Sequence, residues 1–193
     1  MTTVYLARHG QSDWNAARRW QGHADRPLTD LGRRQAAELA ERLRDVALEA
    51  VYSSDLRRAR ETAEAVAAPR GLLVRVRSDL REVDVGSWSG LTRAEAEERF
   101  PEGFARWKAG GHGWEGGEPY DLMAARVVAA VLDLARAHPT GGVLVVAHGG
   151  PIRALHSVAL GLEIAEHRRL TPVAANAHLS RVAVRDGRIT RLD

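Results

Sequence analysis

The residues most able to do chemistry lie in two His-Gly steps, each directly after a short apolar run. His9-Gly10 follows the run at residues 4–7 with Arg8 between them, and His148-Gly149 follows the run at residues 143–147. Such runs predict buried strands, and open α/β sheets hold their ligands outside the carboxyl ends of the strands. An imidazole there, beside a guanidinium, can attack or bind an oxyanion such as phosphate. The alternative is a histidine that only ends a core strand.

Two further segments supply charged groups of the same kind. Residues 53–63 follow another short apolar run and open a helix that carries Arg57, Arg58 and Arg60. Residues 80–90 form a glycine-punctuated loop that carries Glu82 and Asp84. These groups could clamp an oxyanion and transfer a proton.

Together with residues 21–32, these four segments, in this order, resemble the histidine phosphatase superfamily, whose fold is phosphoglycerate-mutase-like. The resemblance covers roughly residues 3–160. It implies an α/β fold in three layers, with a mostly parallel central sheet and helices on both faces. We expect one such domain over residues 1–193.

The resemblance implies a metal-independent phosphomonoester hydrolase that acts on a small phosphorylated metabolite. His9 would be the nucleophile and form a phosphohistidine. Arg8 and Arg58 would clamp the phosphoryl oxygens, with Arg57 and Arg60 left on the helix surface. His148 would donate a hydrogen bond to the same group.

The remaining site residues are a proton donor and two further phosphate ligands. Glu82 is the expected acid and base because the family pattern places a carboxylate after Leu-Arg, and Asp84 is its competitor. Asn15 would add an amide donor, and Gly149 a backbone N–H at the start of a helix. Asn15 could also cap a helix.

A metal site is the rival mechanism. His9, His148 and Glu82 could form a two-histidine, one-carboxylate set. Two arginines aimed at the same spot would repel a divalent cation, so we expect neither a metal nor another cofactor.

Two other functions stay open: a cofactor-dependent phosphoglycerate-type mutase and a non-catalytic module that binds phosphate or phosphoproteins. By resemblance, mutases of this type are longer chains with an insertion after the segment that corresponds to residues 80–90. Here no such insertion is present, and a helix is expected directly from Thr92. The Gly-Gly-Pro-Ile-Arg run after His148 also departs from their pattern. Residues 116–119 resemble a Gly-Glu-Ser loop of the family, but Pro119 stands in place of the serine. This difference weakens the case for carrying over the substrate contact that the loop makes in the family.

Composition limits the partners. Of 28 basic residues all but Lys108 are arginines, 25 residues are acidic, and the formal net charge is +3. Arginines alternate with glutamates, as on a solvated helix face, so we expect no nucleic-acid binding. There is no cysteine, no run of the roughly 20 apolar residues that cross a bilayer, and no signal-peptide pattern at the first residues. We therefore expect a cytoplasmic protein without membrane contact, and the sequence is compatible with a homodimer.

Apolar periodicity and capping signals predict the supporting elements. Helices are expected at residues 30–45, 55–67, 92–101, 120–137 and 151–160, the last ended by Gly161, and a hairpin at residues 178–192. Residues 101–119 are rich in glycine and predict a mobile loop, and we expect residues 101–120 to set leaving-group specificity. Trp14, Trp20, Trp107 and Trp114 could line an apolar entrance, although packing roles are more typical of tryptophan.

Overall fold

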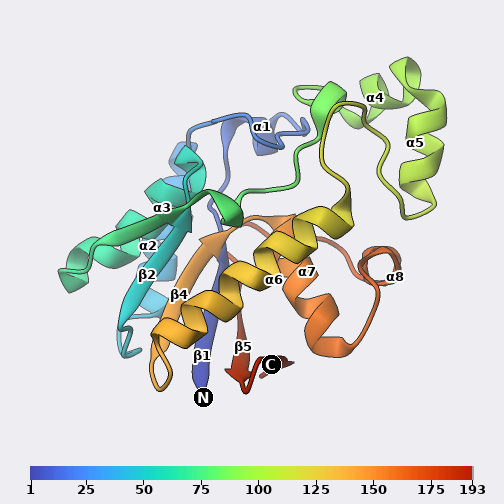
Figure 1. Cartoon of the computed structure of the whole chain (residues 1–193). Helices are drawn as coiled ribbons and strands as arrows, with labels where there is room; N and C mark the ends of the chain where they lie inside the picture. Colours follow the sequence, from blue (N-terminus) through green and yellow to red (C-terminus); the bar gives the residue numbers. More distant parts are fainter. Residues whose placement is uncertain (193) are drawn as a thin grey trace.

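A six-stranded sheet forms the centre of the protein, seen in a computed structural model that describes residues 1–192 (Figure 1). Its order is β3-β2-β4-β1-β5-β6. The first four of these strands are parallel, while β5 pairs antiparallel with β1 and β6 antiparallel with β5. The strands are β1 (Thr2–Arg8), β2 (Ala50–Ser54), β3 (Val74–Arg77), β4 (Gly142–Ala147), β5 (Leu179–Arg185) and β6 (Arg188–Arg191). The sheet is therefore mostly parallel, as the sequence predicts.

Helices cover both faces of the sheet. The α-helices are α1 (Asp13–Ala16), α2 (Asp30–Arg42), α3 (Arg57–Ala67), α4 (Arg93–Arg99), α5 (Pro101–Lys108), α6 (Tyr120–Ala137), α7 (Gly149–Leu160) and α8 (Ile164–Leu170). Along β4, Val143 and Val145 pack with α6 and α7, whereas Leu144 and Val146 pack with α2 and α3. This alternation follows from the two-residue period of a strand. It confirms the three-layer architecture.

The predicted helices are present, with small changes at their ends. Thr92 and Glu95 form the expected capping box of α4. Helix α7 begins at Gly149, and Gly161 ends it in the left-handed conformation at φ 67°. That conformation suits glycine, which has no Cβ to clash. Helix α8 was not predicted from the sequence.

The C-terminal hairpin is also present. Strands β5 and β6 are joined by Asp186 and Gly187, at φ 50° and 74°. Two successive positive φ values are typical of the tight turns whose twist matches the strands they join. The hairpin extends the parallel strands on the β1 side of the sheet.

The prediction of a loop at residues 101–119 is wrong for its first half, which is helix α5 (Figure 1). Pro101 takes the first helical position, where its missing N–H costs nothing. Phe104 is buried among tryptophan rings. A Cβ at Gly103 would lie 2.2 Å from the carbonyl oxygen of Gly113. The glycines here thus mark a close backbone contact between the helix and the returning chain.

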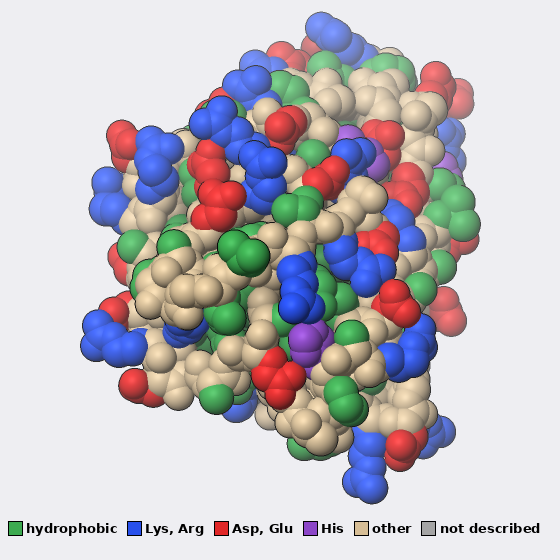
Figure 2. Space-filling model, turned by 60° about the vertical axis from the view of Figure 1, so that its left-hand side comes forward, with side chains coloured by type: hydrophobic (Ala, Val, Ile, Leu, Met, Phe, Trp, Pro, Cys, Tyr) green, Lys and Arg blue, Asp and Glu red, His purple; other side chains and the backbone are tan. Residues whose placement is uncertain are grey.

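Surface charges of both signs are mixed. Figure 2 shows Lys and Arg side chains interspersed with Asp and Glu side chains over one face. Some ion pairs of the protein join residues one turn apart on the same helix, such as Arg33 with Asp30 on α2 and Arg136 with Asp133 on α6. Over residues 1–192, no helix combines the length and apolar character that spanning a membrane requires.

Candidate active site

The two His-Gly steps meet at one edge of the sheet, where the parallel strands β1 and β4 end. Arg8 at the end of β1 is in register with Ala147 at the end of β4, and the His9 backbone N–H donates to the Ala147 carbonyl at 3.0 Å. The His9 and His148 rings follow, with their centroids 5.1 Å apart. The strand register therefore brings together two histidines that are far apart in the sequence.

His9 is buried and has one ring nitrogen fixed. Its Nδ1 lies 2.6 Å from the Gly10 carbonyl oxygen. A carbonyl only accepts, so Nδ1 carries the hydrogen and Nε2 keeps a free lone pair. Burial, followed by the nearby charges of Arg58 and Arg8, lowers the pKa of His9 well below 6.5. The imidazole is therefore neutral at pH 7, as a nucleophile must be.

Gly10 serves the backbone rather than a ligand. A Cβ at Gly10 would lie 2.4 Å from the Gly32 carbonyl oxygen. The Gly10 N–H donates to Thr62 Oγ1 at 3.0 Å. Gly10 therefore allows the loop after β1 to pack against the start of α2.

Among the three arginines at the start of α3, Arg58 is the one that faces the cavity. Its side chain is 1% exposed and lines the cavity beside His9. Its Nη1 and Nη2 donate to the carbonyls of Ala24 and Gly22 at 2.7 and 2.9 Å. By contrast, Arg57 is exposed and pairs with Glu61, and Arg60 is exposed. Burial lowers the pKa of Arg58 to about 10, which leaves it charged at neutral pH.

Four buried nitrogen atoms around His9 have no hydrogen-bond partner in the protein. They are Nε of Arg8, Nε of Arg58 and both ring nitrogens of His148. Arg8 is held by Nη1, which donates to the Ala174 carbonyl at 2.5 Å. Buried polar atoms are almost always satisfied, so this set calls for a polar ligand with several acceptor atoms.

His148 is fully buried and lies behind the cavity wall rather than among the lining residues. Burial, followed by the charge of Arg58, lowers its pKa well below 6.5. A neutral imidazole has one N–H to donate. The expected hydrogen bond from His148 to a bound anion is compatible with this position.

Glu82, and not Asp84, lines the cavity. Its carboxylate accepts from the Gly150 N–H at 3.1 and 3.2 Å and from the Val83 N–H at 3.0 Å. Asp84 instead accepts from the Gly86 N–H at 3.0 Å, within its own turn. The position of Glu82 favours it over its competitor as the proton donor.

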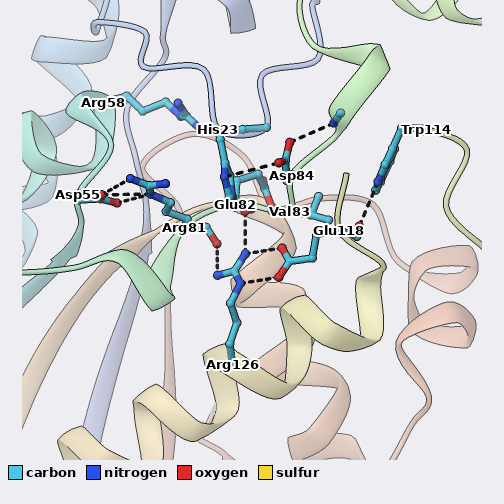
Figure 3. Close-up of polar contacts among 12 residues, drawn as sticks. His23, Asp55, Arg58, Arg81, Glu82, Val83, Asp84, Trp114, Glu118 and Arg126 are labelled. Atoms are coloured by element: carbon cyan, nitrogen blue, oxygen red, sulfur yellow. Dashed lines mark hydrogen bonds and ion pairs between the residues drawn. The ribbon is translucent and has the colours of Figure 1, made fainter. Parts of the chain in front are cut away.

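A half-buried arginine holds the backbone of the Glu82 loop, as Figure 3 shows. Arg126 on α6 donates to the carbonyls of Asp79, Arg81 and Glu82 at 2.9, 2.7 and 2.8 Å. It also forms a two-fold ion pair with Glu118 at 2.7 Å for both bonds. His23 Nε2 lies 2.9 Å from the same Glu82 carbonyl and donates to it. Two segments distant in the sequence, α6 and the loop that carries His23, therefore hold the backbone of Glu82 in place.

Sequence reasoning missed Arg126 and Glu118. Arg126 has only the pattern of a surface helix residue, and nothing nearby in the sequence marks its partners. The sequence already weakens a substrate-contact role for residues 116–119, and in the structure Glu118 pairs with Arg126 and does not line the cavity. Its role is to anchor the chain that returns from α5 to α6.

Asn15 lines the cavity and also takes part in capping α1. Ser12 is the N-cap of α1, and Asn15 is its capping-box partner. Asn15 Oδ1 accepts from the Ser12 N–H and from Asn176 Nδ2, both at 3.1 Å. Because both bonds use Oδ1, its Nδ2 is still able to donate to a ligand. Asn176 also donates to the His9 carbonyl at 3.0 Å and was not predicted.

Gly149 is buried at the start of α7 but does not line the cavity, whereas Gly150 does. A Cβ at Gly149 would lie 2.3 Å from Val173 Cγ2 and 3.8 Å from both Arg8 Nε and Glu82 Oε2. Glycine here lets the segment after α8 close against the site. At the start of α7, the Gly150 N–H donates to the Glu82 carboxylate.

The tryptophans mostly pack against one another. Trp88 and Trp114 are buried, and Trp20 and Trp107 line the cavity with their rings 5.3 Å apart. Trp14 lies outside the lining and stacks with Arg26. Two of the four tryptophans named from the sequence therefore contribute to the cavity wall.

The cavity has a volume of about 490 Å³ and is strongly cationic. Glu82 is the one acidic residue in its lining, against seven arginines: Arg8, Arg18, Arg19, Arg58, Arg93, Arg153 and Arg168. Within residues 1–192, no three His, Asp or Glu side chains are grouped as metal ligands, so His9, His148 and Glu82 do not form the rival metal set. The lining suits an anion.

Comparisons with known proteins agree with this geometry. The family model for the histidine phosphatase superfamily (branch 1) matches residues 4–192. Phosphoserine phosphatase 1 of Hydrogenobacter thermophilus is 34% identical over 168 residues, which cover 86% of this chain and 80% of that protein. Glucosyl-3-phosphoglycerate phosphatase of Mycobacterium tuberculosis is 39% identical over 172 residues, covering 84% and 77%.

A solved structure extends the likeness to the whole fold. The structure of Bacillus stearothermophilus YhfR superposes with a TM-score of 0.92 at 33% identity, over 99% of this chain and 95% of that one. The family match, the named phosphatases and the shared fold all point the same way. The chain belongs to the histidine phosphatase superfamily and is a phosphatase.

Proposed function

We propose that the protein hydrolyses a phosphomonoester of a small metabolite, without a metal, through a phosphohistidine at His9. The observation that carries this proposal is the set of four unpartnered buried nitrogens of Arg8, Arg58 and His148 around the neutral His9 ring. A phosphoryl group offers oxygen acceptors to these donors, and its charge suits the two guanidinium groups.

In the first step, His9 Nε2 attacks phosphorus in line, and the bond from phosphorus to the ester oxygen breaks. Glu82 gives its proton to the departing oxygen, so the leaving group departs as a neutral alcohol. The Nδ1–H bond to the Gly10 carbonyl keeps the reacting lone pair on Nε2. Arg8, Arg58 and His148 hold the charge of the transferring group.

In the second step, water opens the phosphohistidine. Glu82, now ionised, accepts a proton from the water as its oxygen bonds to phosphorus. The bond from phosphorus to Nε2 breaks, and phosphate and the starting imidazole result. The arginine-rich lining supplies the charge that a divalent cation would otherwise bring, which supports a metal-independent reaction.

The proposal is tested by measuring phosphate release from a panel of phosphomonoesters with and without EDTA. We expect turnover that EDTA leaves unchanged. Loss of activity on chelation would mean that a metal takes part and would overturn this mechanism. Absence of release from every ester would favour the mutase or the binding module instead.

Arg126→Met is expected to lower kcat/KM for alkyl phosphates about 10- to 100-fold, because the Glu82 loop loses the donors that position it. Activated aryl phosphates should lose less, since they need less protonation from Glu82. Arg136→Met, an exposed arginine on the same helix, is the matched control. An equal loss on both ester types would show that Arg126 acts on overall structure and not through Glu82.

A further inference from the structure

Two arginines line the active-site cavity without belonging to the set around His9. Arg153 comes from α7 and Arg168 from α8. Within residues 1–192, both donate to backbone carbonyls, and neither has a carboxylate partner. Burial lowers the pKa of each, so both are cations held partly out of water. Desolvated cations of this kind are stabilised by an anion that enters the cavity.

Backbone carbonyls hold both guanidinium groups in place. Arg153 Nη2 donates to the Thr171 carbonyl at 3.0 Å, and its Nε is buried without a partner. Arg168 Nη1 donates to the carbonyls of Gly110 and Gly111 at 2.5 and 2.9 Å. Each group thus keeps N–H donors for a ligand and loses little freedom on binding.

Tyr120 lies against Arg168, with the guanidinium carbon 3.8 Å from the ring centroid. Burial raises the pKa of Tyr120, so its hydroxyl is neutral at pH 7. The charge of Arg153 further lowers the pKa of Arg168, which means that the two cations repel each other. An anion between them relieves this repulsion.

Arg153 lies on the side of the cavity where the leaving group is expected, because it is close along α7 to Gly150, which holds Glu82. Gly150 donates to Glu82, and Arg153 follows three residues later on the same face of α7. Both residues line the cavity. Because Glu82 is the proposed proton donor to the departing oxygen, the rest of the leaving group continues past Glu82 toward Arg153.

We propose that Arg153 and Arg168, with Tyr120, form a second anion site that binds an acidic group on the leaving group. The inference rests on the proposed function and names its substrate class: phosphomonoesters whose alcohol carries a carboxylate or a second phosphate. Of residues 101–120, where the sequence predicts leaving-group specificity, Trp107 and Tyr120 line the cavity, and the second anion site adds residues of α7 and α8 to Tyr120.

Kinetics on a matched pair of esters test this site. Phosphoserine carries a carboxylate that phosphoethanolamine lacks. Arg153→Gln and Arg168→Gln should each lower kcat/KM for phosphoserine about 10- to 100-fold, the loss of one charged hydrogen-bonded pair. Phosphoethanolamine should change far less, and the control Arg136→Gln should change neither. Equal losses on both esters, or none, would overturn the second site.

Binding separates this inference from the proposed function. In His9→Ala, which cannot turn substrate over by the proposed route, calorimetry should show tighter binding of phosphoserine than of phosphoethanolamine. Adding Arg153→Gln should remove that preference. If wild-type protein hydrolyses neither ester yet the preference is present, the proposed function fails and the second anion site stands. If both esters are hydrolysed and bound equally well, the site fails and the proposed function stands.

Discussion

His9→Ala is expected to lower phosphate release by about 10⁴- to 10⁶-fold, the scale on which loss of a catalytic nucleophile acts. His9 is neutral, its Nδ1 is held by the Gly10 carbonyl so that Nε2 is free, and it lines the cavity, whereas His148, the other buried imidazole of the site, does not. The variant should keep its fold, because the loop after β1 is held by the Gly10–Thr62 bond and by backbone packing on Gly32.

The control for this variant is His178→Ala, because His178 is exposed and does not line the cavity. Its phosphate release should match wild type. His9→Ala should still bind inorganic phosphate, since Arg8, Arg58 and His148 remain. Turnover retained in His9→Ala, with melting temperature unchanged, would remove His9 as the nucleophile.

Glu82→Gln is expected to lower kcat/KM for alkyl phosphates about 10²- to 10⁴-fold, the usual contribution of a general acid. Aryl phosphates with good leaving groups should lose much less, because their oxygen departs without a proton. The parameter kcat/KM is the one to compare, since it reports the first phosphoryl transfer and not the later opening of the phosphohistidine.

Asp84→Asn is the matched control for Glu82→Gln. Asp84 lies two residues away and accepts from Gly86 in its own turn, so its loss should affect both ester types alike. A leaving-group dependence in Asp84→Asn, and none in Glu82→Gln, would transfer the acid role to Asp84.

Much of the fold could be predicted because the strand patterns are strong. The continuous apolar run of β4 reflects two buried faces, and the carboxyl ends of parallel strands meet at one edge, which places His9 beside His148. The choice of Arg58 over Arg57 could be made because the family resemblance singles out one residue of the three. These features depend on local pattern or on strand order.

Other features depend on contacts that no local pattern shows. Helix α5 was missed because tertiary packing of Phe104 outweighs the glycine content of its segment. Arg126 was missed because its role comes from carbonyls of a loop more than forty residues away in the sequence. Arg153 and Arg168 read as ordinary helix arginines until the fold places both in one cavity.

Trapping the phosphohistidine shows directly whether His9 is the nucleophile. Glu82→Gln, in which water attack is slowed, would be mixed with an activated aryl phosphate, quenched in alkali and digested for peptide mass spectrometry. We expect a phosphoryl group on the peptide that contains His9, located on that residue, and none in the His9→Ala protein. Continued turnover without a phosphorylated peptide, or a phosphoryl group on any other residue, would contradict the assignment of His9 as the nucleophile.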